Sequence, residues 1–215
     1  MIYNIIKNIG DVMEAKELKE EMKALQKGDI LFVIGENSIG KTTLFSKVDK
    51  NIICKELNKN TAVKNLIKND EIIKEFNIED LLERKINTLS TGEKTLITIL
   101  SNLENEILIV DDILKNLDSK TKEKLLKKIK RLRKDKITIF LTTTSDDILF
   151  GNKTLIMSKE KYLLLDTKKI LEEKNFKEAN ITLPFVIDLS KKLSYYGLVN
   201  KNYYEIDKLV NDLWK

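Results

Sequence analysis

The feature that most constrains this 215-residue chain is an apolar segment that runs directly into a glycine-bearing loop. Five consecutive apolar residues, Ile30–Ile34, have the length and composition of a buried parallel strand. The residues that follow match the pattern G-x-x-x-x-G-K-S/T, and a helix is expected from Lys41 to about residue 47. Glycines let the backbone curl so that successive N–H groups point at a phosphate, and the start of a helix adds a partial positive charge. This order of strand, loop and helix predicts a phosphate-binding loop.

Each part of the loop has an expected role. The Lys41 ammonium is expected to reach the outer phosphates of a nucleotide, and the Thr42 hydroxyl to hold Mg²⁺. ATP and Mg²⁺ are therefore the expected cofactors. The candidate nucleotide-binding residues are Gly35, Glu36, Asn37, Ser38, Ile39, Gly40, Lys41, Thr42 and Thr43.

A second apolar segment, Ile107–Asp112, ends in two carboxylates. Open α/β sheets bind their ligands at the carboxyl ends of the strands, so Asp111 is a candidate for the magnesium shell. Asp112 stands where a residue could orient or deprotonate an attacking water. Alone, two aspartates after a strand would also suit a helix N-cap. Beside a phosphate-binding loop, the catalytic interpretation is favoured.

Strand-like and helix-like segments alternate along most of the chain, which predicts an α/β fold with a parallel sheet covered by helices on both faces. Residues 1–27 are interpreted as a short apolar strand followed by a charged helix or turn, and 52–57 as a short strand. The other expected elements are a helical region over 61–85, a polar turn at 88–93 opening a helix to about Leu103, a helix over 119–134, strands at Ile137–Thr142, Thr154–Met157 and Tyr162–Leu165, and short helices from Thr167 onward.

Composition excludes several classes of chemistry. The chain has no histidine and a single cysteine, Cys54, which excludes His-ligated metals, Ser-His-Asp catalysis and an internal disulfide. No apolar run is long enough to cross a membrane, so we expect a cytoplasmic protein.

The net charge is +5, and the lysines of helix 119–134 are better explained as a solvated outer face than as a nucleic-acid site. No nucleic-acid partner is expected.

Taken together, the motifs resemble the ATPase subunits of ABC transporters over residues 28–166. The phosphate loop reads GENSIGKTT, the strand ILIVDD resembles the magnesium-binding strand of the family, and Asn116-Leu117-Asp118 resembles its D-loop. The segment that resembles the family's LSGGQ signature is Leu89-Ser90-Thr91-Gly92-Glu93. The resemblance implies a P-loop NTPase fold with a small helical subdomain that carries the signature.

The C-terminal residues resemble one branch of that family. Leu183-Pro184-Phe185, Gly197-Leu198 and the terminal Leu213-Trp214 follow the order found in the energy-coupling-factor ATPases. By periodicity alone, an amphipathic helical tail that closes a core would be the simpler interpretation. We therefore expect an ABC-type ATP-binding domain at 1–166 and a C-terminal helical segment at 167–215, with dimerisation as a candidate role for the latter.

The resemblance implies a function. Two ATPase subunits, identical or different, would close head to tail over two ATP molecules, with the signature of each subunit touching the ATP bound by the other. The chain would serve an importer together with a membrane subunit, as a peripheral protein on the inner face of the cell membrane. The alternatives are a soluble ABC-type ATP switch outside transport and a regulatory subunit that has lost catalysis.

Five departures from the family pattern bear on this function. The switch histidine of the family falls at Thr143, and its catalytic glutamate is Asp112, which is one methylene shorter. Ser38 and Ile39 replace small residues of the loop. Only 46 residues separate Thr43 from Ser90, without a glutamine, so Lys55 is the nearest candidate for the Q-loop position. Tyr3 fits the adenine-stacking position poorly. We therefore expect firm ATP binding and slow hydrolysis.

Overall fold

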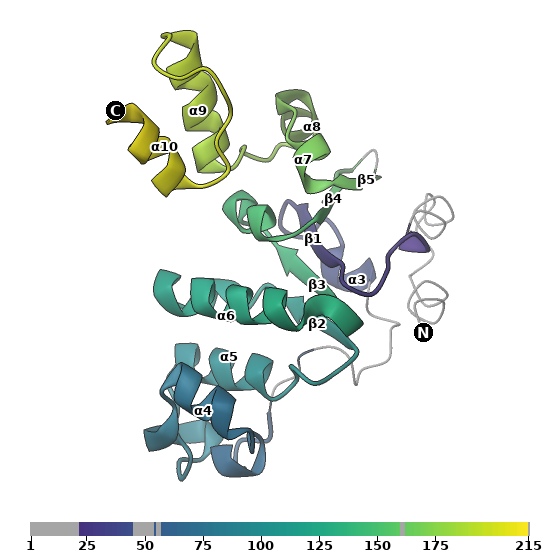
Figure 1. The fold of residues 1–215 in the computed structure, drawn as a ribbon. Coiled ribbons are helices and arrows are strands. Elements are labelled where there is room, and N and C mark those ends of the chain that lie inside the picture. The colour runs from purple at the N-terminus through teal and green to yellow at the C-terminus, as the bar shows by residue number, and fades with distance from the viewer. Residues whose placement is uncertain (1–21, 45–53, 55–56, 160–161, 215) are drawn as a thin grey trace.

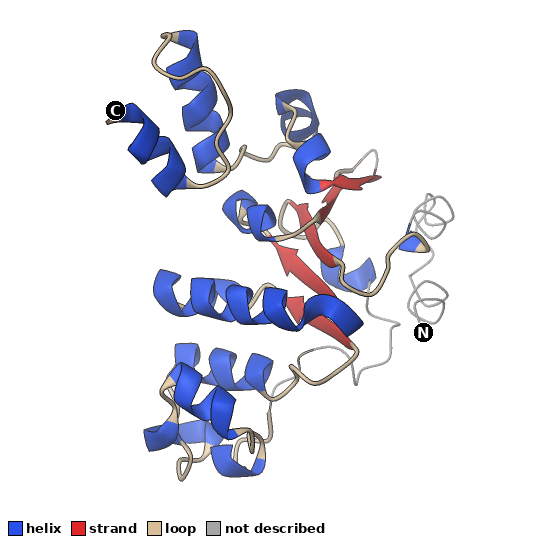
Figure 2. Cartoon of the chain, viewed as in Figure 1, coloured by secondary structure: helices blue, strands red, loops and turns tan. Residues whose placement is uncertain are grey.

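The computed structural model describes residues 22–44, 54, 57–159 and 162–214 (Figure 1). Strands and helices alternate up to residue 166, and helices alone follow (Figure 2). The elements are β1 Ile30–Gly35, α3 Lys41–Leu44, α4 Asp70–Phe76, α5 Thr91–Leu100, β2 Ile107–Asp111, α6 Ser119–Leu132, β3 Ile137–Thr142, β4 Lys153–Met157, β5 Tyr162–Asp166, α7 Thr167–Ile170, α8 Glu173–Glu178, α9 Phe185–Tyr195 and α10 Ile206–Leu213.

The five strands form one sheet in the order β2-β3-β1-β4-β5. The first four are parallel, and β5 returns antiparallel to β4. The register places Phe32 of β1 opposite Phe140 of β3, and their rings stack with centroids 4.8 Å apart. Because β1, β2 and β3 run the same way, their carboxyl ends meet at one edge of the sheet.

Both faces of β1, β2 and β3 are buried, which explains why their sequences are mostly apolar, while the edge strand β5 is half-buried. Side chains of a strand alternate between the two faces, so Phe32 and Ile34 join the larger core while Leu31 and Val33 join a smaller one. The larger core includes helices α4, α5 and α6, of which α6 lies alongside the strands (Figure 2). Among the described residues outside the sheet, Met22 and Leu25 contribute buried side chains to the smaller core.

The expected strands are confirmed, as is the basic helix at 119–134. The helix that opens at the polar turn ends at Leu100 instead of near Leu103. The antiparallel β5 modifies the expectation of a purely parallel sheet. The strand and turn expected within residues 1–27 lie for the most part outside the described residues, as do the strand at 52–57 and the end of the helix at 47.

The helical region expected over residues 61–85 is wrong as a continuous helix. The structure has the seven-residue α4 between short 3₁₀ turns at Val63–Asn65 and Glu79–Leu81. Asn69 starts α4, because its side chain accepts the N–H groups of the first turn. Asn77 ends it in the left-handed conformation, with φ of 52°. Two asparagines therefore interrupt a helical apolar pattern.

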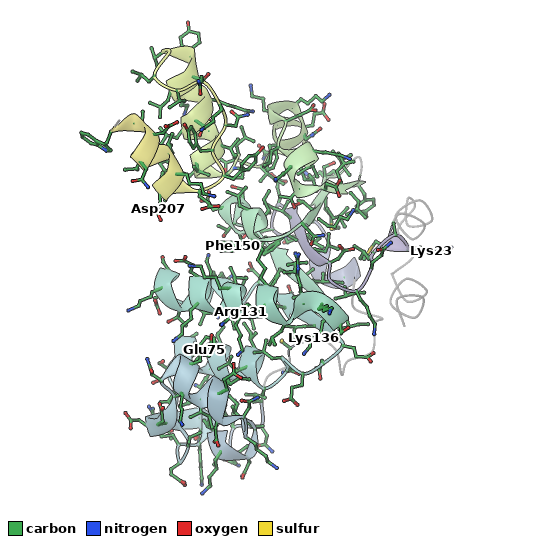
Figure 3. The ribbon with its side chains drawn as sticks, viewed as in Figure 1. Lys23, Glu75, Arg131, Lys136, Phe150 and Asp207 are labelled. Carbon is green, nitrogen blue, oxygen red and sulfur yellow. The ribbon has the colours of Figure 1, made fainter. Side chains whose placement is uncertain are left out.

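Ion pairs join this small helical subdomain to α6. Lys128 of α6 lies 2.7 Å from a Glu71 oxygen and 2.8 Å from a Glu75 oxygen, and only 6% of its side chain is exposed. The hydrogen bonds that the Lys128 ammonium donates to Glu71 and then Glu75 raise its pKa above the ordinary value. Arg131, one turn further on, also pairs with Glu75, and Figure 3 shows the two labelled side chains on neighbouring helices. The subdomain is thus fixed to the sheet by charge as well as by apolar packing.

The C-terminal helices share the larger core. Val186 and Ile187 of α9 and Leu209 of α10 are buried in it, and the buried Ser190 hydroxyl accepts the Tyr203 N–H at 3.2 Å. These contacts agree with an amphipathic tail that closes a core. No helix of the described residues is long and apolar enough to cross a membrane.

The stacked phenyl rings give a test of the core. Phe140→Ala removes a fully buried ring between β1 and β2, so we expect a loss of about 3–5 kcal/mol in the free energy of unfolding, measured by urea denaturation. The matched control is Leu132→Ala at the exposed end of α6, with an expected loss below about 1 kcal/mol. Equal losses for the two variants would contradict the assignment of Phe140 to the centre of the core.

Candidate functional site

The sequence-predicted site residues come together at the carboxyl edge of the sheet. The phosphate loop leaves β1, Asp111 and Asp112 lie at the end of β2, and Thr143 follows β3. Strand β3 pairs with both neighbours, and its Leu141 is opposite Val33 of β1 and Asp111 of β2. Parallel pairing therefore places the loop, the two carboxylates and the threonine beside one another.

The loop backbone requires glycine at both ends of the motif. A Cβ atom on Gly35 would lie 2.7 Å from the Met157 carbonyl oxygen, and Gly40 has a φ of 100°. Ser38 also lies in the left-handed region, with φ of 63°. Ile39, one of the unusual residues of the loop, packs against the smaller core. The departure at Ile39 thus has a packing explanation. Ser38 holds a left-handed backbone conformation that costs a serine more free energy than it would cost a glycine.

Lys41 is the buried cation of the loop. Its ammonium donates to the carbonyl oxygens of Gly35 and Glu36, both at 2.7 Å, and the residue is 8% exposed. Burial lowers the pKa of Lys41, and the charges of Asp112 and then Asp111 partly offset that effect. An ammonium has three protons to donate, so two protein bonds leave one for a ligand.

Thr42 and Asp111 form the pair of oxygens expected at a magnesium ion. The Thr42 hydroxyl donates to Asp111 Oδ2 at 2.8 Å across the gap between α3 and β2. Hydroxyl and carboxylate oxygens suit Mg²⁺, which keeps several waters and is bound through few protein groups plus phosphate oxygens. No cluster of three or more His, Cys, Asp or Glu side chains that could hold a metal occurs in the described part of the chain. The residues therefore fit a nucleotide-bound Mg²⁺ better than a metal held by protein alone.

Asp112 has left the strand and takes the left-handed conformation, with φ of 50°. Its N–H donates to the Leu141 carbonyl at 2.9 Å, which fixes the residue to β3. Its carboxylate pairs with the Lys115 ammonium three residues later. Sequence reasoning missed Lys115, since a lysine in a charged loop gives no signal of its own. The pair engages one of the two carboxylate oxygens, Oδ2.

Thr143 is half-buried in the loop that follows β3. The loop is held by Asp147, which accepts from the Thr142 hydroxyl at 3.3 Å and pairs with Lys122 of α6 at 2.6 Å. The Asp147 side chain is only 4% exposed, so losing its cation would leave a nearly buried charge. Asp147 and Lys122 are thus positioning residues that the sequence pattern did not reveal.

The signature segment begins α5. Ser90 is the N-cap: its hydroxyl accepts the Glu93 N–H at 3.2 Å, and the Glu93 carboxylate accepts the Ser90 N–H at 2.7 Å. The hydrogen bond from the Ser90 N–H is the main reason that the pKa of Glu93 is lowered, and Arg84 lies 3.4 Å from the other carboxylate oxygen. Leu89 is buried and Thr91 is exposed. Both polar groups of Ser90, the N–H and the hydroxyl, are thus engaged with Glu93 in a capping box.

Gly92 and the D-loop are in contact. A Cβ atom on Gly92 would lie 3.2 Å from the Asn116 carbonyl oxygen, and the Asn116 amide donates to the Thr95 hydroxyl of α5 at 3.1 Å. Asp118 caps α6 and accepts the Thr121 N–H at 3.0 Å, and its hydrogen bonds to Thr121 lower its pKa. The D-loop therefore links α5 to α6. Helix α5 lies apart from α3 within the chain (Figure 1).

Two further sequence assignments fall on or beside residues outside the described part. Lys55, the Q-loop candidate, and Tyr3 are both outside it. Cys54 is described, and its N–H donates to the Ile109 carbonyl of β2 at 2.8 Å. Burial raises the pKa of its thiol to about 12, which agrees with an inert packing residue.

Similar proteins are known from sequence, although no family model matches the chain. Energy-coupling factor transporter ATP-binding protein EcfA1 of Mycoplasmopsis synoviae (strain 53) is 31% identical over 188 residues, which cover 82% of this chain and 68% of that protein. The EcfA1 of Mesomycoplasma hyopneumoniae (strain 7448) is 33% identical over 149 residues, covering 64% of this chain and 52% of that protein. The chain thus spans about two thirds of the first relative and about half of the second.

Solved structures share the fold. A chain of a metal-chelate type ABC transporter in an inward-facing conformation superposes with a TM-score of 0.61 at 21% identity, covering 73% of this chain and 79% of that one. CbiO1 of Clostridium perfringens, part of the ABC transporter complex CbiONQ, superposes with a TM-score of 0.55 at 19% identity, covering 78% of this chain and 89% of that one. These likenesses confirm the predicted α/β fold.

Proposed function

The chain belongs to the energy-coupling factor transporter ATP-binding proteins, and from this premise we propose that it binds Mg-ATP as the ATPase subunit of an ABC-type importer. The observation that carries the proposal is the Thr42–Asp111 hydrogen bond of 2.8 Å beside the buried Lys41. The hydroxyl and the ammonium from α3 and the carboxylate from β2 thus lie together at the edge where α/β sheets bind ligands. ATP-binding relatives of the same family support it.

The proposed roles follow from the geometry. The backbone N–H groups of residues 35–43 and the Lys41 ammonium bind the phosphates, which places positive charge against negative charge. Thr42 and Asp111 hold the Mg²⁺ that neutralises the β- and γ-phosphates. When bound, that ion stabilises charge that develops on the phosphates during transfer. The residues of the chain bind and orient; they form no covalent bond to the nucleotide.

Assembly as a head-to-tail dimer, with an identical or a related ATPase, explains the open N-terminus of α5. Its N-cap residue is Ser90, and helix N-termini attract anions. In the proposed dimer, Leu89, Ser90, Thr91, Gly92 and Glu93 face the γ-phosphate bound by the partner. Glu93 brings a carboxylate to this face, and its ion pair with Arg84 reduces the repulsion between that carboxylate and the γ-phosphate.

Hydrolysis is proposed to be slow. Asp112 would direct the attacking water, but its carboxylate is short and engaged by Lys115. Thr143, at the other side of the water, offers a hydroxyl without a positive charge. Small errors in the placement of a catalytic group are costly, since a displacement of about 1 Å can reduce a rate about a hundredfold.

The proposed partners are a second ATPase subunit and a membrane subunit, with the chain peripheral on the inner face of the cell membrane. Residues 1–166 would form the ATP-binding domain, and 167–215 a helical segment that shares its core and contributes to dimerisation. The short segment between Thr43 and Ser90 favours the two alternatives, a soluble ABC-type ATP switch outside transport and a regulatory subunit that does not turn over ATP.

Nucleotide binding is tested by Lys41→Ala. The change removes the ammonium at the phosphates, so we expect Mg-ATP affinity to fall at least about a hundredfold in calorimetry. Lys127→Ala, which removes an exposed lysine of α6, is the matched control and should bind like the wild type. Similar affinities for all three proteins would overturn the phosphate-loop assignment.

Assembly is tested by Ser90→Arg. Light scattering should show a dimer of the wild type with Mg-ATP, and Ser90→Arg should remain monomeric because its bulk would fill the space of the partner's phosphate. Asn60→Arg places the same side chain on an exposed turn of the same subdomain and should dimerise normally. The head-to-tail proposal fails for this chain if Ser90→Arg dimerises with ATP as the wild type does.

Chemistry is tested by Asp112→Asn. Asparagine tolerates the left-handed backbone, so only the negative charge is lost. Phosphate release should fall about 10²-fold or more while Mg-ATP affinity stays within about threefold. Turnover that survives this change would show that Asp112 does not direct the water.

A further inference from the structure

The C-terminal segment reaches the phosphate loop through one hydrogen bond. The Asn180 amide nitrogen donates to a carboxylate oxygen of Glu36, the second residue of the loop. The main-chain carbonyl of the same glutamate accepts from the Lys41 ammonium at 2.7 Å. Glu36 is therefore held on both sides, by the phosphate-binding cation and by a residue 144 positions away.

The position of Asn180 is fixed by the end of α8. Asn180 takes the left-handed conformation, with φ of 54°, and its N–H donates to the Lys177 carbonyl at 3.0 Å. The next N–H, of Ile181, closes the helix end on the Phe176 carbonyl at 2.9 Å. Phe176 is 1% exposed and belongs to the larger core. The asparagine side chain thus projects from an anchored turn.

The same segment has a second anchor beside the site. The Phe185 N–H, at the start of α9, donates to the Asp146 carboxylate at 2.6 Å. Asp146 follows the loop that carries Thr143. Residues 180–185 therefore bridge two of the loops beside the proposed nucleotide, the loop that follows β1 and the loop that follows β3.

Glu36 poses an electrostatic problem for nucleotide binding. Its side chain is half-buried and carries a negative charge at the edge where a triphosphate would bind. Like charges at short range in a partly buried site repel strongly. Hydrogen bonds to charged groups are among the stronger hydrogen bonds, so an amide donor can fix the orientation of the Glu36 carboxylate.

We propose that Asn180 is a positioning residue of the phosphate loop, which binds the Glu36 carboxylate and keeps its charge off the phosphates of the nucleotide. This inference rests on the proposed Mg-ATP site. It gives the C-terminal segment a role in nucleotide affinity that packing against the core does not require.

The test is a double-mutant cycle on Mg-ATP affinity. Asn180→Gly removes the amide while glycine keeps the left-handed backbone without strain. We expect it to weaken binding about tenfold, because the Glu36 carboxylate is released. In the Glu36→Gln background, the same change should weaken binding less than about twofold, because no charge remains to be positioned.

A salt series separates positioning from a general structural effect. The loss of Mg-ATP affinity caused by Asn180→Gly should shrink as the salt concentration rises from about 0.05 M to about 0.5 M, because screening weakens the repulsion between Glu36 and the phosphates. Asn180→Asp keeps the shape and backbone of the asparagine but sets a second carboxylate against Glu36, so its loss should exceed that of Asn180→Gly. Thermal unfolding midpoints show which variants fold, and Asn180→Asp provides the test if Asn180→Gly does not.

The outcomes are distinct. Equal losses in both Glu36 backgrounds, or a loss that salt does not change, would overturn the inference. Wild-type affinity in Asn180→Gly would also overturn it, while leaving the Mg-ATP site intact. If the wild type binds no better than Lys41→Ala, the proposed function fails and the inference with it.

Discussion

Strand β3 hydrogen-bonds to β1 on one side and to β2 on the other, and the site depends on this arrangement. The phosphate loop and the aspartates are about 70 residues apart in sequence, yet Leu141 lies opposite both Asp111 and Val33, which is two residues before the loop. The stacking of Phe32 on Phe140 and the burial of both strand faces fix the register. A slip of one residue would exchange the two faces of a strand and move its functional end, so packing in the core determines geometry at the edge.

Polar groups at that edge are held by partners that lie deeper in the protein. Asp147 joins the loop after β3 to Lys122, and the Lys41 ammonium donates a hydrogen bond to the phosphate loop at the Gly35 carbonyl oxygen. These bonds satisfy groups that would otherwise be buried without partners, which is costly. They also hold the donors of the proposed phosphate site in place before any ligand arrives. Such preorganisation reduces the entropy lost on binding.

Much of this could be predicted from local sequence, and the reasons for the exceptions are physical. Ile107–Val110 and Ile137–Leu141 are apolar runs whose burial on both faces gives a strong signal. The loop motif is also a local signal, since Gly35 and Gly40 are required by close backbone contact and by a positive φ, respectively.

The missed features depend on contacts between distant residues or on competition between signals. The apolar periodicity over 61–85 is helical, but Asn69 and Asn77 offer hydrogen bonds that start and stop the helix. The pairs Asp112–Lys115 and Glu36–Asn180 join charged or polar residues of ordinary kinds, so nothing marks them in the sequence. Their importance appears only when the fold brings them to the sheet edge.

Helix α6 has one further consequence. Its first turn is capped by Asp118 at the D-loop, and its last turns hold Glu71 and Glu75 of the small helical subdomain through Lys128 and Arg131. A helix of this length is stiff, and its buried ammonium cannot leave both carboxylates without a large loss of free energy. The helix therefore connects the small helical subdomain to the loop beside the signature helix.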